Sequence, residues 1–158
     1  MQRQQGDAED LGWALGVLAR SYRDAVTPVL GDFPHGPRGY QTLSAVVHGD
    51  APSQLALASR LGIDRTVMTY LVDDLERDGL VERVPNPQDR RQRRIVATDR
   101  GRDLLALMCE RVEAAEDVVL GVLDDGERTA FRAMLTKLAG RGDRAADACE
   151  LVAEGAAG

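Results

Sequence analysis

The stretch of sequence that decides the fold is residues 55–101, LALASRLGIDRTVMTYLVDDLERDGLVERVPNPQDRRQRRIVATDRG. Its first half predicts a short helix, a tight turn at Gly62 and a second helix over 65–78, which Asp64 caps and Gly79 ends. Helix, short glycine turn and helix is the spacing of a helix-turn-helix, whose second helix enters the major groove of DNA. Because many buried helix pairs share this pattern, it does not by itself separate DNA binding from a structural role.

The second helix is amphipathic. We place Val67, Leu71 and Leu75 on its buried side, with Met68 and Val72 on an adjoining ridge. The outward side then carries groups that can hydrogen-bond base edges and phosphates, namely Arg65, Thr66, Thr69, Tyr70 and Asp73.

A β-hairpin is predicted directly after the second helix. Leu80–Val84 and Arg90–Ala97 are β-compatible, and turn-forming residues separate them. A hairpin in this position makes a winged helix, and an arginine on its tip can enter the narrow minor groove. The arginines at or beside the tip are Arg90, Arg91, Arg93 and Arg94. We expect the Asp89 carboxylate to pair with the Arg91 guanidinium; the alternative is a solvated charged loop.

The charge distribution bears on the choice between DNA binding and a structural role. The chain of 158 residues has a net charge of −6 and a pI of about 4.9, which counts against nucleic acid as a partner. Residues 83–102, however, hold seven arginines against two aspartates, whereas residues 103–158 carry a net −6. A strongly basic hairpin within an acidic chain predicts weak binding to random DNA and a steep loss of specific binding with added salt.

Long amphipathic helices are predicted at both ends of the chain. The first, capped by Asp7, carries its apolar stripe through Leu11, Leu15, Leu18, Tyr22, Ala25 and Val29, and Pro28 should bend or end it. A shorter helix follows over Tyr40–His48. After the hairpin, Thr98 caps a helix to about Leu123, with Leu104, Met108, Val112, Ala115, Val119 and Val122 as its stripe. A last helix starts near Glu127 and uses Phe131, Met134, Leu135 and Leu138. Such helices favour a dimer over an intramolecular bundle, because one small lobe cannot cover them.

Residues 55–101 resemble the DNA-binding lobe of the multiple-antibiotic-resistance regulator (MarR) family. The matching pieces, in order, are Leu61–Arg65, Leu71–Asp73, Leu75-Glu76, Gly79–Val81, Pro87–Arg91, and Thr98 with Gly101. The resemblance implies a mainly α fold in one domain, 1–158, with a winged helix-turn-helix lobe over 40–101 and dimerisation helices over 7–31 and 103–153. It also implies a homodimer that binds a palindromic operator in double-stranded DNA, most often as a repressor. Many members release DNA when a small aromatic or phenolic effector, or an oxidant, acts.

Carried over by position, the resemblance makes Arg65, Thr66, Thr69 and Tyr70 the major-groove readers. It places Ser53 and Gln54 where the preceding helix meets a DNA phosphate. It places Asp89 and Arg91 in the wing, beside Arg90 and Arg93. Relatives often carry arginine where this chain has Tyr70, and a small polar residue in place of Val67, so we expect a different base preference. An effector pocket would use Trp13, Tyr22 and Tyr40, with Phe33; plain core packing is the alternative role for these aromatic residues.

Other functional classes find little support in the sequence. Asp73 and Asp74 are adjacent on a helix, so their side chains diverge and cannot act as an acid–base pair. We find no nucleophile motif, phosphate-binding glycine loop or metal-ligand spacing, and we expect no catalytic site, metal or cofactor.

We interpret His35 and His48 as ordinary surface residues, and thiol sensing by Cys109 or Cys149 as a weak hypothesis. With no apolar run long enough for a membrane span, we expect a cytoplasmic, nucleoid-associated protein. The competing function is a winged-helix protein-interaction or dimerisation module, from which the arginine-rich tip distinguishes a DNA-binding protein.

Overall fold

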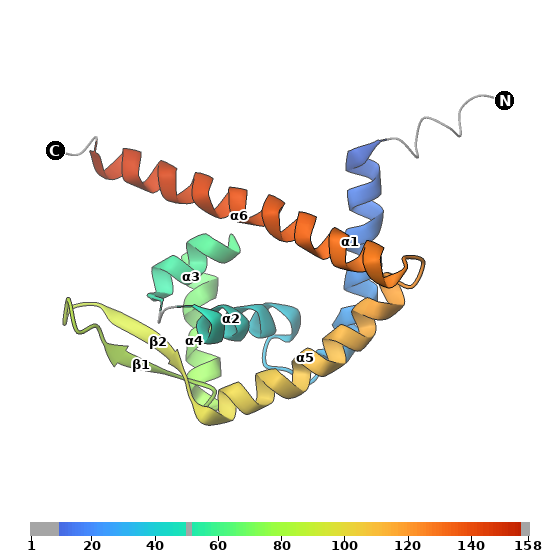
Figure 1. Cartoon of the computed structure of the whole chain (residues 1–158). Helices are drawn as coiled ribbons and strands as arrows, with labels where there is room; N and C mark the ends of the chain where they lie inside the picture. Colours follow the sequence, from blue (N-terminus) through green and yellow to red (C-terminus); the bar gives the residue numbers. More distant parts are fainter. Residues whose placement is uncertain (1–9, 50–51, 156–158) are drawn as a thin grey trace.

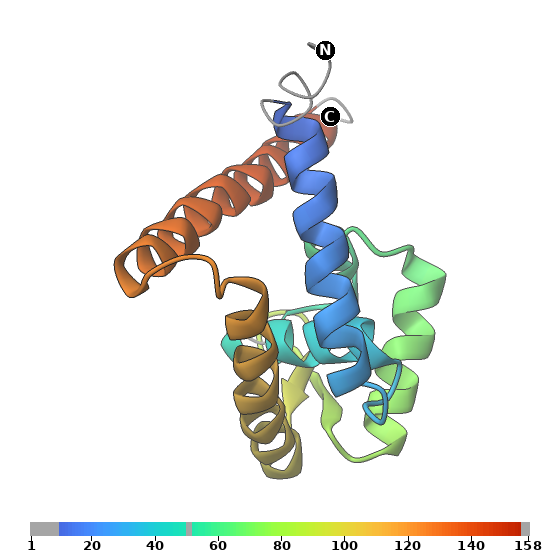
Figure 2. The same ribbon diagram turned by 90° about the vertical axis from the view of Figure 1, so that its right-hand side faces the viewer.

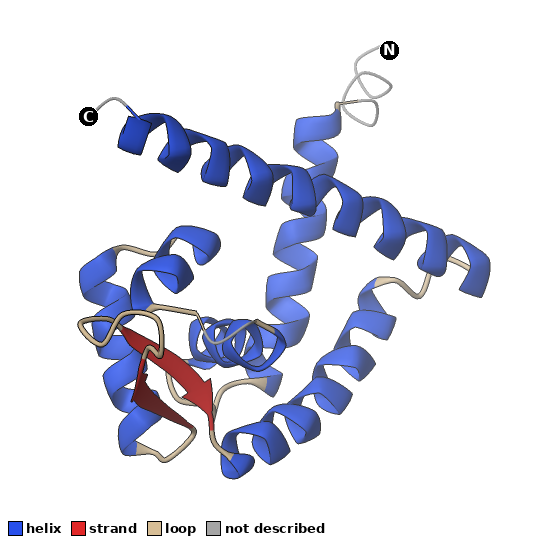
Figure 3. Cartoon of the chain, turned by 60° about the vertical axis from the view of Figure 1, so that its left-hand side comes forward, coloured by secondary structure: helices blue, strands red, loops and turns tan. Residues whose placement is uncertain are grey.

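The computed structural model describes residues 10–49 and 52–155, with side chains described up to residue 140. Within this part, six helices and one two-stranded hairpin are found (Figures 1 and 3). In chain order they are α1 Leu11–Val29, α2 Gly36–His48, α3 Gln54–Leu61, α4 Arg65–Arg77, β1 Val81–Pro85, β2 Arg93–Ala97, α5 Asp99–Val119 and α6 Asp125–Gly155. The mainly α winged-helix fold expected from the sequence is confirmed. Among the described residues, no helix combines the length and hydropathy needed to cross a membrane.

The core lies where α2, α3, α4, the hairpin and the first half of α5 meet. Its fully buried side chains include Leu43, Leu57, Leu71, Leu75 and Ile95. The end of α1 reaches this core through Val26 and through Leu30, the residue that follows the helix. The helix-turn-helix and the wing are therefore parts of one packed lobe.

The turn and cap of the helix-turn-helix form as expected. Gly62 adopts a left-handed backbone conformation (φ 61°), and the Asp64 carboxylate accepts hydrogen bonds from the backbone N–H groups of Thr66 (2.8 Å) and Val67 (3.3 Å). These two features fix where α3 ends and where α4 begins.

The predicted buried side of α4 was wrong at one residue. Val67 is 36% exposed, whereas Met68, Leu71, Val72 and Leu75 are all 1% exposed or less. These four buried residues occupy positions i, i+3, i+4 and i+7 of one helical face. Val67 belongs to the outward face.

The hairpin is shorter than expected. Its strands are antiparallel, with Val81 opposite Ala97 and Pro85 opposite Arg93. Arg90 and Arg91 consequently lie in the loop between the strands. The hairpin joins α5 at a close contact: a Cβ on Gly101 would lie 2.0 Å from the carbonyl oxygen of Leu80.

Two of the predicted helix boundaries were also wrong. α2 begins at Gly36, four residues before Tyr40, because Pro37 suits the first turn of a helix and does not interrupt it. α5 ends at Val119, so Val122 lies beyond it and is 92% exposed. The expected cap Asp7 lies outside the described residues, and Asp10 accepts the capping hydrogen bond from the Trp13 backbone N–H (3.1 Å).

The end helices form arms that extend from the lobe. Figure 1 shows α6 crossing the top of the molecule, and Figure 2 shows α1 rising from the lobe while α6, which follows α5, slants toward the same end of the molecule. Much of the apolar surface of the arms is exposed, including Leu11, Trp13, Leu15, Met134 and Leu138.

Candidate DNA interface and adjoining cavity

Four of the first six residues of α4 are exposed on its outward face: Arg65, Thr66, Val67 and Tyr70. Tyr70 is 63% exposed. Thr69 is half-buried, since its hydroxyl donates to the Arg65 carbonyl (3.0 Å) and accepts from the Gln54 side-chain amide (2.6 Å). The predicted readers thus share one surface, but Thr69 is already engaged within the protein.

Arg83 of β1 is a structural residue of this interface that sequence reasoning missed. Its guanidinium forms ion pairs with Asp73 (2.5 Å) and Glu76 of α4 and donates to the Gln54 side-chain oxygen (3.2 Å). This arginine holds the wing, α4 and the start of α3 in register. The signal in the sequence was the pair Asp73 and Glu76, three residues apart on one helix face, although nothing in the sequence identified their partner.

Ser53 and Gln54 lie at the start of α3, as the proposed phosphate contact requires. The Ser53 hydroxyl accepts from the Ala56 backbone N–H (3.2 Å), and Ser53 also pairs with Arg94 through an isolated β-bridge. The Gln54 side chain is occupied by Thr69 and Arg83. These bonds fix the start of α3 beside the wing.

The wing tip carries arginines without ion-pair partners among the described residues: Arg90, Arg91 and Arg93 are exposed and take part in none of the ion pairs found there. The expected pairing of Asp89 with the Arg91 guanidinium is not formed. Asp89 instead accepts a hydrogen bond from the Arg91 backbone N–H (3.0 Å). A carboxylate that bonds the backbone two residues on is an Asx turn, which shapes the loop and leaves the guanidinium available.

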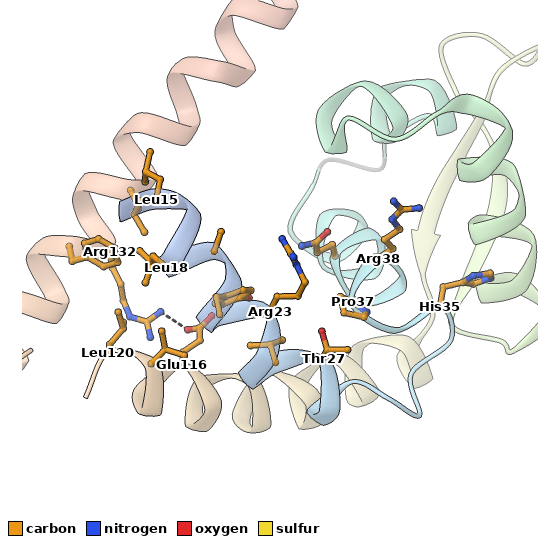
Figure 4. A pocket seen from close by; sticks show the side chains of 17 residues that line it. Leu15, Leu18, Arg23, Thr27, His35, Pro37, Arg38, Glu116, Leu120 and Arg132 are labelled. Carbon is orange, nitrogen blue, oxygen red and sulfur yellow. Dashed lines mark hydrogen bonds and ion pairs between the residues drawn. The ribbon is translucent and has the colours of Figure 1, made fainter. Parts of the chain in front are cut away.

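A cavity of about 770 Å³ lies between the arms and the lobe (Figure 4). α1, the start of α2, the end of α5 and α6 supply its walls. One end, mainly apolar, carries Leu15, Leu18 and Leu120 beside the ion pair of Glu116 and Arg132, and the other, the cationic end, carries Arg23 and Arg38. Its lining includes Leu15, Leu18, Val26, Leu120, Phe131 and Leu135, together with Tyr22, Arg23, His35, Arg38, Glu116 and Arg132.

The three aromatic residues expected to form a pocket do not all line this cavity. Tyr22 lines the cavity, whereas Trp13 and Tyr40 do not. Trp13 is 54% exposed. Tyr40 lies in the lobe, where its ring packs edge-on against Phe33 at 6.1 Å and its hydroxyl lies 3.3 Å from the Cys109 sulfur.

Charges inside the cavity are unevenly compensated. Glu116 pairs with Arg132 (2.7 Å), and burial together with the Glu116 carboxylate raises the pKa of Tyr22 above its ordinary value. Arg23 and Arg38 form no ion pair within the described part of the chain. Figure 4 shows both side chains reaching out from their helices at the cationic end. That end can receive an anionic group.

His35, expected to be an ordinary surface residue, connects this cavity to α4. Its Nε2 lies 2.5 Å from a carboxylate oxygen of Asp74, whose other oxygen pairs with Arg77. The hydrogen bond from His35, and then the contact with Arg77, lower the pKa of Asp74.

The described residues hold no group of three or more side chains suited to a metal ion. Asp73 and Asp74 point to different partners, Arg83 and His35, as their adjacent positions on a helix require. Cys109 is a free thiol, and the side chain of Cys149 lies outside the described residues.

A recognition helix with an exposed polar face, followed by a wing with unpaired arginines, defines the winged helix-turn-helix class. The sequence model of the MarR family matches residues 37–92. A MarR-family transcriptional regulator from Rhodococcus sp. RHA1 has a similar structure, with a TM-score of 0.74 and 28% identity over 88% of this chain and 96% of the other. CouR from Rhodococcus jostii RHA1, solved bound to p-coumaroyl-CoA, is 30% identical over 84% of this chain and 93% of its own, with a TM-score of 0.71.

A sequence relative, the putative regulatory protein for the hcr operon of Thauera aromatica, is 30% identical over 65% of this chain. The match spans 61% of that relative's length. The chain belongs to the MarR family of transcriptional regulators.

Proposed function

We propose that the chain is a sequence-specific DNA-binding regulator that binds a palindromic operator as a homodimer and represses transcription. The observation that carries the proposal is the pairing, on one packed lobe, of the exposed first turns of α4 with the unpaired arginines of the wing tip. In this proposal Arg65, Thr66 and Tyr70 read the major groove, and Arg91 enters the minor groove. Repression and a location on bacterial DNA in the cytoplasm belong to the same proposal.

The homodimer is proposed from the arms. The apolar stripe of α1 is exposed at Leu11 and Leu15, and that of α6 at Met134 and Leu138. A second copy would bury both and could set two recognition helices about one DNA turn apart, roughly 34 Å. The helices that would form this dimerisation region lie within 7–31 and 103–153, beside the DNA-binding lobe over 40–101.

The cavity is proposed to bind an effector with an aromatic or apolar body and an anionic group. Its apolar walls suit the body, and the guanidinium groups of Arg23 and Arg38 suit the anion. In support, the ligand of CouR, p-coumaroyl-CoA, joins a phenolic ring to phosphate groups. Tyr22 contributes an aromatic wall and a protonated hydroxyl.

Selection of bound fragments from a genomic DNA library tests the proposed function. The wild-type chain should enrich a few fragments that share one palindromic motif. Tyr70→Ala should enrich a different motif while its salt dependence stays similar, because Tyr70 faces bases and carries no charge. If neither chain enriches a motif above a shuffled library, the protein-interaction alternative replaces DNA recognition. If both return the same motif, Tyr70 is not a major-groove reader.

A further inference from the structure

We propose that His35 transmits the occupancy of the cavity to the recognition helix α4. The His35–Asp74 contact fixes α4 against the segment between α1 and α2, and a ligand that fills the cationic end of the cavity breaks this contact. The proposal rests on the proposed effector role of the cavity and assigns its regulation to one contact.

The position of His35 supports this role. Among the described residues that line the cavity, His35 alone has a hydrogen bond to α4. Figure 4 shows it at the edge opposite Leu15 and Leu18, with its ring pointing away from the apolar end. Arg38 lines the same cavity three residues further along the chain, so an anion held by its guanidinium would occupy the end of the cavity that His35 also lines.

The chemistry of the contact makes it a two-state element. The Nε2 of His35 can donate to the Asp74 carboxylate or to a ligand anion, but not to both with good geometry. The second partner of Asp74, Arg77, lies on α4 itself. When His35 leaves, α4 therefore keeps its internal ion pair and loses its polar link to the cavity.

The backbone of His35 indicates that the surrounding structure holds this residue in place. Its φ is 60°, and it is the one non-glycine residue with a positive φ in the described part of the chain. Residues with a Cβ are uncommon in this conformation, and such outliers persist where the surrounding structure requires them. The backbone carbonyl of Phe33, buried two residues earlier, accepts a hydrogen bond from the Gly36 backbone N–H (2.7 Å) and anchors the segment.

The test compares wild type with His35→Asn and Arg77→Ala. Asparagine tolerates the left-handed backbone, but its side chain is too short to reach Asp74. Arg77→Ala is the matched control, because it removes the other partner of the same carboxylate and leaves the cavity contact intact. The first measurement is hydrogen exchange of the α4 amides in the free, full-length protein. We expect exchange to be at least fivefold faster in His35→Asn and within twofold of wild type in Arg77→Ala. Equal exchange in His35→Asn and wild type would overturn the proposal.

The second measurement uses 8-anilinonaphthalene-1-sulfonate, a fluorescent aromatic anion, with an operator duplex from the genomic selection. In wild type we expect saturating probe to lower the operator affinity at least fivefold, within the usual range of allosteric coupling. In His35→Asn the probe should still bind within threefold of its wild-type affinity, but it should lower operator affinity less than twofold. Undiminished coupling in His35→Asn contradicts the proposal.

The outcomes also separate the two proposals. If the probe binds wild type without changing operator affinity, the cavity is not linked to α4 and the His35 proposal fails, while DNA recognition stands. If no operator is found, the proposed function fails, and the exchange comparison still decides whether the His35 contact fixes α4.

Discussion

At the residue scale, α4 carries buried apolar side chains on one face and the side chains proposed to read DNA on the other. Met68, Leu71 and Leu75 are buried against the rest of the lobe, and Arg65 and Tyr70 face outward. Burial of apolar side chains supplies most of the free energy that holds such a helix in place, whereas polar groups on the open side cost little to change. Substitutions on the two faces should therefore separate folding from DNA binding.

Leu71→Ala should lower the free energy of unfolding by about 2–5 kcal/mol, since it leaves a cavity at a side chain that is 1% exposed. Val67→Ala should cost about 0.5 kcal/mol or less, as is usual on a surface. Urea unfolding at one fixed protein concentration measures both. Similar losses for the two variants would place Val67 in the core and contradict the observed rotation of α4.

The rotation of α4 marks a limit of sequence-based prediction. The apolar spacing of 65–78 fits either of two neighbouring stripes, and the sequence pattern favoured the one that contains Val67. Packing selects the other, because the side of α4 that carries Met68 and Val72 meets the core. Sequence therefore predicts that the helix is amphipathic, but its rotation depends on contacts with α2, α3 and the hairpin, which lie outside the helix itself.

Arg91→Ala should weaken operator binding by about 1–3 kcal/mol, because it removes a guanidinium that is available to enter the minor groove. Fluorescence anisotropy with a labelled operator duplex measures the change. Arg111→Ala is the control, since it removes one exposed positive charge from the middle of α5. An equal loss in both variants would indicate a general charge effect and would remove Arg91 from its proposed role.

At the element scale, the wing shows what local sequence can and cannot predict. The hairpin and its position after the helix-turn-helix follow from the β-compatible segments on either side of 85–89. The roles of the charged side chains do not follow from local sequence, because they depend on neighbours that lie far away in the chain. The guanidinium of Arg83 is paired with α4 and is therefore not available to a ligand. Arg90 and Arg91, by contrast, form no ion pair within the described chain.

Substitutions of Asp89 test whether operator binding by the wing tip depends on the Asx turn or on a charge pair. Asp89→Asn keeps an oxygen that can accept the Arg91 backbone N–H and should retain operator affinity to within twofold. Asp89→Ala removes the acceptor and should weaken binding by about 0.5–1.5 kcal/mol, the usual net value of one hydrogen bond. If the asparagine variant binds as weakly as the alanine variant, the negative charge is what matters, and the turn is not the determinant.

At the scale of the whole molecule, charge is divided between the wing and the arms. The seven arginines of residues 83–102 gather in and beside the wing, while the net −6 of residues 103–158 falls on α5, α6 and the link between them. In the proposed dimer this acidic part faces away from DNA and limits non-specific binding. The low pI of the chain is therefore compatible with DNA as a partner.

The apolar stripes of the arm helices could be predicted from sequence. Which surface buries these stripes could not. The stripe of α1 is amphipathic as expected, yet Leu11, Leu15 and Tyr22 are exposed in the single chain. Periodicity shows that a face is apolar and does not show whether the same chain or a second copy covers it. The cavity likewise depends on how α1, α5 and α6 meet, which local sequence does not show; of the three aromatic residues expected in a pocket, Tyr22 lines it and Trp13 and Tyr40 do not.

Leu138→Glu should convert the proposed dimer to a monomer, because Leu138 is 64% exposed on α6 and a buried carboxylate would be unpaired in the interface. Sedimentation velocity should show half the wild-type mass, and operator affinity should fall at least tenfold because one lobe is left to bind. The far-ultraviolet circular dichroism should stay close to that of wild type, since the core of the lobe is untouched. A variant that stays dimeric would remove this part of α6 from the proposed interface.

In the proposed complex, two winged-helix lobes read one operator through α4 and the wing. A hydroxyl-radical footprint of the wild-type protein on the selected operator tests this arrangement most directly. We expect two protected regions, related by the symmetry of the palindrome and centred about 10 base pairs apart, with minor-groove protection outside them that is lost in Arg91→Ala. A single protected region, or protection that is the same on shuffled DNA, would contradict the arrangement.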